Sequence, residues 1–385
     1  MEINKFVNRL LGSDLKNSKK SVLLLGPRQT GKSTLIKSLK PDLIINLANE
    51  REYLRYTTDI GYLESILQEA RPKTVFIDEI QRIPNLLNTL QDIIDNWSSA
   101  PKFYLSGSSA RKLKRGQANL LPGRIFSFQM SGFSYRELNF KVNLKRSLQY
   151  GFLPENYLNT NDRETEKNLD MYSANYLAEE IKAEAAARNI QGFARFLNEC
   201  AVRSGQVIDY SKIAAQAKVS RTSSLRFYEI LEDTLIAERI SSYAIEGVET
   251  IKHPKLYFFD VGVLNGMLNN FSVSADRVGN LFEHLVYNQI RNSALALDKK
   301  INIQFFRTRH GLEVDFIIEL GKKKYAIEVK SGQITAGDTQ ALQALKAYDP
   351  SVENCFIVGL KETENRKIND VTVCGVTQLL KSLGL

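Results

Sequence analysis

The sequence predicts an α/β protein of several domains, and three observations support this prediction. An apolar run, Ser21–Leu25, leads into a glycine-rich loop and then into a helical segment. In the middle of the chain, two helical segments flank a short turn at residues 218–219, and the last third alternates β-rich and helical runs. The chain has 385 residues, which is enough for about two or three domains.

The composition is that of a globular protein, because apolar residues make up 43% and charged residues 25% of the chain. This excludes a disordered or fibrous protein. The net charge of +9 suits a polyanionic partner such as nucleic acid, although soluble proteins that bind none often carry a similar excess. The cysteines, Cys200, Cys355 and Cys374, have neither metal-site nor disulfide-framework spacing, so we expect buried thiols in a reducing compartment.

The first residues lack the apolar stretch of a signal peptide, and no window is long and apolar enough to span a membrane. We therefore expect a cytoplasmic protein without a membrane partner.

The loop after the first apolar run has the pattern G-x-x-x-x-G-K-[ST] of a phosphate-binding loop. It consists of Gly26, Pro27, Arg28, Gln29, Thr30, Gly31, Lys32 and Ser33, followed by Thr34 in the next helix. The glycines let successive backbone N–H groups turn toward a phosphate, and the helix start adds partial positive charge. We expect these nine residues to bind ATP, with Lys32 at the β- and γ-phosphates and Ser33 as a ligand of Mg²⁺.

A second apolar strand, Thr74–Ile77, ends in two carboxylates, Asp78 and Glu79. Because open α/β folds bind ligands at the carboxyl ends of their strands, we expect both carboxylates near the phosphate loop. Asp78 would hold Mg²⁺, and Glu79 would orient and deprotonate the attacking water. The pair therefore favours ATP hydrolysis over nucleotide sensing.

The next strand, Lys102–Leu105, ends at Ser106, with Ser108 two residues further along the chain. At this sheet edge, Ser106 or Ser108 would contact the γ-phosphate as part of the catalytic machinery. The alternative is that these serines only cap a helix, since serine is a favoured N-cap residue. A basic stretch follows and leads to Arg124 and the strand Ile125–Met130.

Four segments together resemble the prokaryotic AAA+ ATPases that carry a C-terminal DUF4143 domain, namely residues 26–34, 76–81, 106–113 and 121–124. The likeness covers nearly the full chain and implies a P-loop AAA+ core over residues 1–132, a parallel sheet flanked by helices. It also implies a homo-oligomer, a ring with nucleotide between subunits, in which a neighbour supplies an arginine finger. Arg124 is the first candidate for this finger and Arg111 the second.

We expect residues 133–192 to form a helical connector and residues 193–270 a winged helix-turn-helix domain. Ser220 is placed to cap the third helix, residues 220–231, and the strands 237–240 and 255–259 would form the wing. The residues near the start of that helix, where major-groove contacts are made, are Arg221, Thr222, Ser223 and Arg226. They predict DNA binding, and the alternative is that this module packs against protein.

Residues 271–385 contain a further set of polar residues, Glu283 on a predicted helix and Asp315, Glu328 and Lys330 on two β-rich runs joined by a turn. This set resembles the PD-(D/E)xK nuclease core and implies a restriction-endonuclease-like α/β domain. The resemblance implies that Asp315 and Glu328 bind Mg²⁺, that Glu283 completes the metal shell, and that Lys330 orients water or stabilises developing charge. A solvated hairpin with Glu–Lys ion pairs is the simpler alternative, and such domains also bind branched DNA without cutting it.

Taken together, the motifs predict Mg²⁺-dependent ATP hydrolysis by a ring-forming ATPase that binds or remodels DNA, including branched DNA. Two other functions stay open. One is an ATP-dependent switch that binds a protein partner through a degenerate nuclease-like adaptor domain. The other is an ATP-gated, metal-dependent DNA nuclease.

Overall fold

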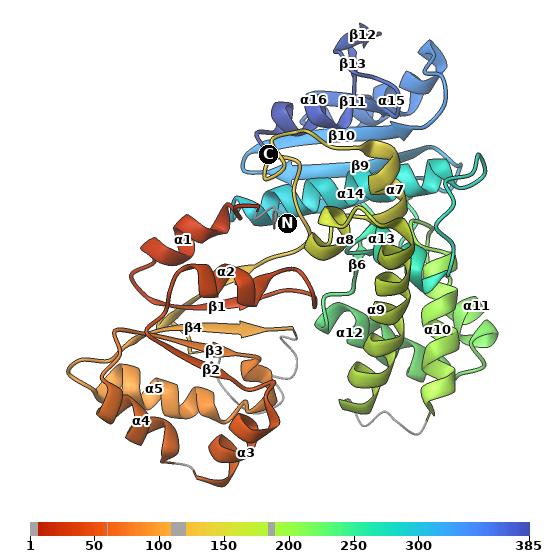
Figure 1. The fold of residues 1–385 in the computed structure, drawn as a ribbon. Helices are drawn as coiled ribbons and strands as arrows, with labels where there is room; N and C mark the ends of the chain where they lie inside the picture. Colours follow the sequence, from red (N-terminus) through yellow and green to blue (C-terminus); the bar gives the residue numbers. More distant parts are fainter. Residues whose placement is uncertain (1–6, 60, 109–120, 184–188) are drawn as a thin grey trace. The chain divides into compact units, whose positions relative to one another are not determined.

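The computed structural model describes residues 7–59, 61–108, 121–183 and 189–385 (Figure 1). Its contacts divide the chain into two compact units. The first contains Met1–Ser131 with Asp233–Leu235, and the second contains Gly132–Glu232 with Ile236–Leu385. Arg111 and the basic stretch around it lie outside the described residues.

The first unit is built on a five-stranded parallel sheet with the order β2-β3-β4-β1-β5. The strands are β1 (Ser21–Leu25), β2 (Leu43–Asn46), β3 (Thr74–Asp78), β4 (Lys102–Gly107) and β5 (Ile125–Gln129). Every residue of β1 is buried, as expected for a central strand covered on both faces. The strands predicted from the apolar runs are therefore confirmed.

Helices cover both faces of this sheet, and two hydrophobic clusters hold them there. The helical segments are α1 (Leu11–Asn17), α2 (Lys32–Ser38), α3 (Glu50–Thr58), α4 (Tyr62–Ala70), the 3₁₀ turn η1 (Ile80–Arg82) and α5 (Leu86–Asn96). Leu24 of β1 lies in the cluster with α1 and α2, whereas its neighbour Leu23 lies in the cluster with α4 and α5. Since successive strand residues face opposite sides, the unit is a three-layered α/β domain with a P-loop ATPase fold.

The first part of the second unit is mainly helical. Its elements are α7 (Leu144–Tyr150), α8 (Pro154–Leu158), α9 (Asp162–Ala183), α10 (Ile190–Val202), α11 (Tyr210–Gln216), α12 (Arg221–Asp233), α13 (Val261–Met267) and the antiparallel strands β6 (Ala237–Ile240) and β7 (Lys255–Phe258). The predicted helices and strands are present, and Ser220 Oγ accepts from Ser223 N at 3.1 Å, as a cap does. Leu169 of the connector and Tyr228 of α12 share one hydrophobic core.

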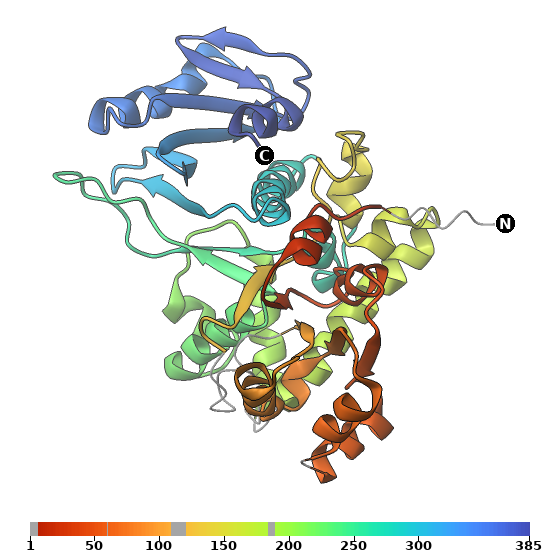
Figure 2. The ribbon, with the colours of Figure 1, turned by 90° about the vertical axis from the view of Figure 1, so that its left-hand side faces the viewer.

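The segment between β6 and β7 does not stand free as a wing. Tyr243 N donates to Phe305 O at 2.6 Å, and Ile251 N donates to Arg307 O at 2.9 Å, so this segment runs along the edge strand of the C-terminal sheet (Figure 2). The Lys324 ammonium also donates to the Tyr243 hydroxyl at 2.7 Å. The predicted wing strands exist, but their connection is used for contacts within the chain.

The C-terminal part contains a mixed six-stranded sheet with the order β12-β13-β11-β10-β9-β8. Its strands are β8 (Ile301–Arg307), β9 (Glu313–Leu320), β10 (Lys323–Lys330), β11 (Asn354–Gly359), β12 (Arg366–Ile368) and β13 (Val371–Cys374), and its helical segments are α14 (Val278–Ala296), the 3₁₀ turn η3 (Ala336–Thr339), α15 (Gln340–Tyr348) and α16 (Val376–Leu383). Tyr287 of α14 packs against Phe316, whereas Leu342 of α15 clusters with the adjacent Ile317. The two helices therefore cover opposite faces, and the predicted hairpin turns at Gly321.

All three cysteines are buried free thiols, as predicted. In the described ranges, the structure contains no helix with the length and apolar character needed to cross a membrane.

Candidate functional site

The phosphate loop begins where β1 ends, and its first glycine is required by close packing. A Cβ atom on Gly26 would lie 2.1 Å from the Met130 carbonyl oxygen, which is closer than two such atoms can approach. Gly31 has φ +89°, in the left-handed region that favours glycine, and α2 starts directly after it. Both glycines of the motif are therefore needed to bring the loop from the strand to the helix.

Lys32 is buried and its side chain folds back on the loop. Its ammonium donates to Gly26 O at 2.9 Å and to Pro27 O at 2.7 Å. Burial lowers the pKa of Lys32 from 10.5 to about 8. Of the other loop residues, Thr30 is buried and donates to Pro27 O at 2.9 Å, Arg28 is half-buried, and Gln29 and Thr34 are exposed.

The predicted acidic edge of the sheet forms one hydrogen-bonded set beside the loop. Ser33 Oγ donates to Asp78 Oδ1 at 2.8 Å, and Ser106 Oγ donates to the same oxygen. Glu79 N in turn donates to Ser106 Oγ at 3.3 Å. The hydroxyl of Ser33 and the carboxylate of Asp78 are oxygen donors of the kind that Mg²⁺ prefers, so these residues fit the predicted metal role.

Ser106 is completely buried, and its hydroxyl is already engaged by Asp78 and Glu79. Ser108 also points into the site, where it accepts from Gln81 Nε2 at 3.0 Å. Ser106 thus connects the carboxylate of Asp78 to the backbone of Glu79.

Gln81 was not singled out from the sequence. Its Nε2 group donates to the carboxylate of Glu79, whose own backbone has the left-handed φ of 60°. A Cβ atom at Gly107, the last residue of β4, would lie 2.8 Å from Gln81 Oε1. The glycine therefore leaves space for the glutamine side chain. Gln81 therefore fixes the direction of the Glu79 carboxylate.

Arg9 is a second residue that sequence reasoning missed. Its guanidinium donates to Thr30 O at 2.7 Å and to Ser131 O at 2.8 Å. It thereby ties the phosphate loop to the chain just after β5. A single arginine upstream of a motif gives no pattern from which this contact could be inferred.

Arg124 lies at the opposite end of the sheet from the phosphate loop. Ile125 is aligned with Ser21, the first residue of β1, whereas the loop follows Leu25, the last residue of that strand. Arg124 Nε donates to Asp95 Oδ1 at 2.6 Å. The residue is therefore placed away from the phosphates of its own subunit, and a finger role would require a neighbouring copy.

The candidate DNA-contacting residues lie on the first two turns of α12. Arg221, Thr222 and Arg226 are exposed, while Ser223 is half-buried and lies with its hydroxyl 2.9 Å from that of Ser220. Lys212 and Lys218, in α11 and in the turn before α12, are exposed as well.

The second set of predicted residues lines an open pocket of about 590 Å³ in the second unit. The last aligned pair of β9 and β10 is Phe316–Ile327, so Asp315 and Glu328 follow at the same end of this hairpin. The lining residues are Gly205, Gln206, Val207, Lys255, Asn280, Glu283, Arg307, Glu313, Asp315 and Glu328. Three of the four predicted residues are thus brought together.

The fourth, Lys330, pairs with Glu328 Oε1 at 2.9 Å. The other oxygen of this carboxylate, Glu328 Oε2, is buried and has no hydrogen-bond partner within the described part of the chain. Asp315 Oδ2 accepts from Val329 N at 2.8 Å. Burial and the nearby charge of Glu283 raise the pKa of Asp315 well above its usual value, and burial raises the pKa of Glu328.

Lys255 of β7 was expected in the wing, and it lies instead among these carboxylates. It is 3% exposed, with its ammonium 2.9 Å from Glu313 Oε1 and 3.6 Å from Glu283 Oε1. Burial alone lowers the pKa of Lys255, but the surrounding carboxylates outweigh it and raise the value overall. The Tyr257 hydroxyl, from the same strand, donates to Glu283 Oε1.

The pocket meets only part of what a Mg²⁺ site requires. Carboxylate oxygens are suitable donors, and Glu328 Oε2 is one that no described residue pairs with. However, the residues that the structure describes include no group of three or more His, Cys, Asp or Glu side chains placed so that they could hold a metal ion. The carboxylate oxygens are therefore of the kind that a divalent cation binds, but in this structure the Lys255 ammonium contacts two of the carboxylates, Glu283 and Glu313.

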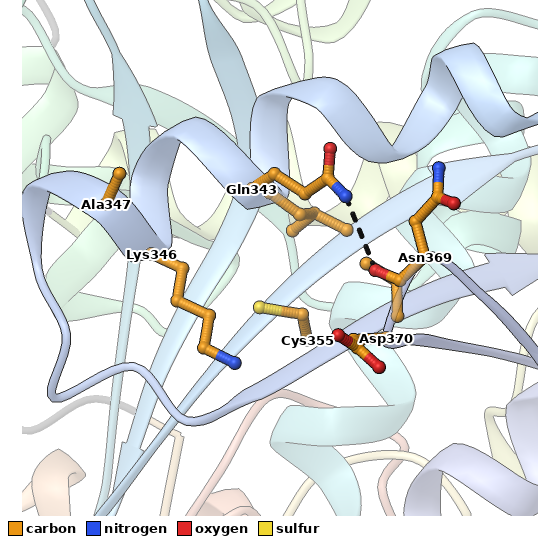
Figure 3. A pocket seen from close by; sticks show the side chains of 8 residues that line it. Gln343, Lys346, Ala347, Cys355, Asn369 and Asp370 are labelled. Atoms are coloured by element: carbon orange, nitrogen blue, oxygen red, sulfur yellow. Dashed lines mark hydrogen bonds between the residues drawn. The ribbon is translucent and has the colours of Figure 1, made fainter.

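Another hollow of about 350 Å³ lies between α15 and the turn from β12 to β13 (Figure 3). Its lining includes Gln343, Lys346, Cys355, Asn369 and Asp370, with Gln343 Nε2 donating to Asn369 O at 3.4 Å. Burial raises the pKa of the Cys355 thiol. The residues that line this hollow do not include any predicted site residue.

Comparisons with known proteins agree with the predicted AAA and DUF4143 domains. A family model for an AAA domain matches residues 18–139, and models for two domains of unknown function, DUF8612 and DUF4143, match residues 141–274 and 278–379. Uncharacterized proteins of Mycobacterium bovis and Mycobacterium tuberculosis are each 25% identical over 317 residues, which are 80% of this chain and 70% of theirs.

Two solved structures show weaker similarity. One is a Signal Transduction ATPase with Numerous Domains (STAND) protein with a tetratricopeptide repeat sensor from Pyrococcus horikoshii, at 14% identity and a TM-score of 0.26, covering 77% of this chain and 48% of that one. The other is a protein from Vibrio cholerae, at 12% identity and a TM-score of 0.21, covering 94% and 96%. With the AAA model on the sheet that carries the phosphate loop, the chain has an N-terminal AAA domain with a P-loop ATPase fold and a C-terminal DUF4143 domain.

Proposed function

We propose that this protein hydrolyses ATP in a Mg²⁺-dependent reaction and uses the energy to bind or remodel DNA. The observation that carries the hydrolysis is the hydrogen-bonded set of Ser33, Asp78 and Ser106 beside the phosphate loop, with Glu79 next to it. A site for nucleotide sensing alone would not need the second carboxylate.

The chain's own groups account for the steps. The Lys32 ammonium exchanges two loop carbonyls for the β- and γ-phosphate oxygens, while the loop N–H groups hold the phosphates. Ser33 and Asp78 would hold Mg²⁺, which neutralises charge that develops on the phosphates when it is bound. Glu79 orients the attacking water and accepts its proton once the carboxylate turns from Gln81 toward the water.

Replacing Glu79 by Gln tests this assignment. Glu79→Gln should bind ATP with nearly unchanged affinity and lose hydrolysis, because the amide cannot accept the proton. Glu69→Gln, at an exposed position on α4, is the matched control and should keep full activity. Wild-type hydrolysis by Glu79→Gln would refute the role of Glu79.

The proposal of DNA binding is supported by the exposed basic residues at the start of α12 and by the net charge. Arg221→Ala with Arg226→Ala should weaken duplex binding in fluorescence anisotropy and reduce the slope of log K against log salt by about 1.8, or about 0.9 for each lost phosphate contact. Arg163→Ala with Lys167→Ala, two exposed residues of α9, is the control. Equal slopes for both double variants would refute the α12 interface.

We also propose a homo-oligomeric ring in which Arg124 reaches the nucleotide of a neighbour, since its place at the far end of the sheet suits that role. Arg124→Ala and Lys32→Met should each be inactive alone. Mixed together, they should recover part of the hydrolysis, because some sites pair an intact loop with an intact Arg124. No recovery, in a mixture that co-sediments as one oligomer, would refute Arg124 as the finger.

DNA cleavage is a second candidate function, favoured by the gathering of Glu283, Asp315 and Glu328 in one pocket. Asp315→Asn should then abolish cutting in the presence of Mg²⁺ and leave ATP hydrolysis intact. An ATP-dependent switch that binds a protein partner through this domain predicts instead that no form of DNA alters the hydrolysis rate.

A further inference from the structure

The pocket lined by Glu283, Glu313, Asp315 and Glu328, called the acidic pocket below, is built from two parts of the chain. Separate family models match these two parts. Lys255 and Tyr257 belong to the segment matched over residues 141–274, and the carboxylates belong to the segment matched over residues 278–379. In β7, the residues next to these two, Leu256 and Phe258, are buried in the hydrophobic core of the middle helices. The position of Lys255 is therefore set by the middle region.

Lys255 acts as a counter-ion held inside the pocket. A lysine is almost never this deeply buried unless it is paired, and here it contacts Glu313 and Glu283 and lies 5.3 Å from the centre of the Phe305 ring. These contacts compensate for the cost of removing the ammonium from water. The charge that a bound cation would supply to Glu283 is thus already supplied by the protein.

Glu328 Oε1 pairs with Lys330 at 2.9 Å, which leaves Asp315 and the second oxygen of Glu328 without such an ion pair among the described residues. Asp315 is held by a backbone N–H, and Glu328 Oε2 is buried without a hydrogen-bond partner within the described residues. Together with Glu283, they carry the donor oxygens that a divalent cation would use. What keeps them from forming such a site is that Glu283 is tied to Lys255 and Tyr257.

We propose that Lys255 is a positioning residue that takes the place of a divalent cation in the acidic pocket, so that the metal reaches Glu283, Asp315 and Glu328 only by displacing its ammonium group. This inference rests on the proposed metal role of the pocket, and it does not require that the protein cuts DNA. Because β7 is fixed in the middle core, a shift of the middle region would change the metal affinity of the C-terminal domain.

The first test measures Mn²⁺ binding to the nucleotide-free full chain by the EPR signal of free Mn²⁺. Lys255→Met should bind Mn²⁺ at least about tenfold more tightly than wild type, because a competing positive charge has been removed. Lys324→Met is the matched control, since Lys324 is a paired lysine on β10, the strand that also carries Glu328, and it should bind like wild type. Adding Asp315→Asn should abolish the gain. Equal or weaker binding by Lys255→Met, or no binding by either protein, would overturn the proposal.

A second test uses wild-type protein and does not depend on the folding of a variant. Reductive methylation followed by mass spectrometry should leave Lys255 unmodified without Mn²⁺ and modify it at saturating Mn²⁺, while Lys324 reacts equally in both. Asp315→Asn should remove the Mn²⁺ effect. Equal protection of Lys255 with and without Mn²⁺ would overturn the proposal. Absence of DNA cleavage alongside Mn²⁺-dependent labelling would refute cleavage and support the displacement of Lys255.

Discussion

Ser106 joins the two acidic residues of the nucleotide site, and replacing it by alanine tests that role. Its buried hydroxyl donates to Asp78 Oδ1 and accepts from Glu79 N at 3.3 Å. Alanine removes both bonds and adds no bulk. Asp78 keeps its bond from Ser33 at 2.8 Å, so the carboxylate loses one of two hydroxyl contacts and the Glu79 backbone loses its acceptor.

The expected magnitude follows from these two bonds. A hydrogen bond to a charged group contributes about 1.5–3 kcal/mol and a neutral one about 0.5–1.5 kcal/mol, so Ser106→Ala should lower the free energy of unfolding by about 2–4 kcal/mol. If the charged bond acts mainly by aligning Asp78 in the transition state, its loss corresponds to about a 10- to 100-fold decrease in kcat.

The assay is steady-state ATP hydrolysis, with urea unfolding to confirm the fold. Ser106→Ala should lower kcat by at least about tenfold while the KM for ATP changes little, since the phosphate-binding groups are untouched. Ser65→Ala, at an exposed position on α4, is the control. A folded Ser106→Ala variant with wild-type kcat would refute the reasoning.

Three further predictions concern the phosphate loop. The pKa of Lys32 is lowered to about 8 from 10.5, so the unfolded chain binds more protons between these values and stability rises with pH across that window. At pH 7 the folded chain carries the full cost of a charged, buried ammonium, which methionine removes. Lys32→Met should therefore raise the free energy of unfolding in urea by about 1–3 kcal/mol at pH 7 and by less at pH 9.5. An equal increase in the free energy of unfolding at both pH values would contradict this prediction. Arg9→Ala should weaken binding of a fluorescent ATP analogue by about three- to tenfold, because the phosphate loop loses its connection to Ser131. Arg51→Ala, at an exposed position, is the control. Equal affinities of the two variants for the analogue would contradict the role of Arg9. Gly26→Ala should abolish ATP binding in calorimetry and lower Tm, because its Cβ would lie 2.1 Å from Met130 O. Gly61→Ala is the control, since the nearest atom to its Cβ would be 3.6 Å away. ATP binding by Gly26→Ala as tight as by Gly61→Ala would contradict the packing argument.

The nucleotide site could largely be predicted because its motif encodes local backbone geometry. Gly31, Lys32 and Ser33 are consecutive, and the strand before Asp78 is a continuous apolar run. The sequence therefore indicated both which residues meet and at which sheet edge. Arg9 and Gln81 escaped prediction because their contacts are made by tertiary packing, and neither residue belongs to a spacing pattern.

The second pocket could be predicted only in part. Two β-rich runs joined by a turn placed Asp315 and Glu328 on a hairpin, and the register shows that they lie at the same end of it. Lys255 was predicted as a wing residue, since nothing local distinguishes it from other lysines at a strand start. Its burial among carboxylates depends on how the middle strands pack against the C-terminal sheet, as does the pairing of the 241–254 segment with β8.

The most direct test of the central claim is ATP hydrolysis by the purified chain, alone and with single-stranded, duplex, forked and four-way-junction DNA at two salt concentrations, with Glu79→Gln as the control. We predict that one form of DNA raises the rate, that higher salt reduces this stimulation through weaker phosphate contacts, and that Glu79→Gln abolishes hydrolysis. A rate that no DNA alters, and that Glu79→Gln still abolishes, would contradict the DNA-directed function and favour the protein-binding switch.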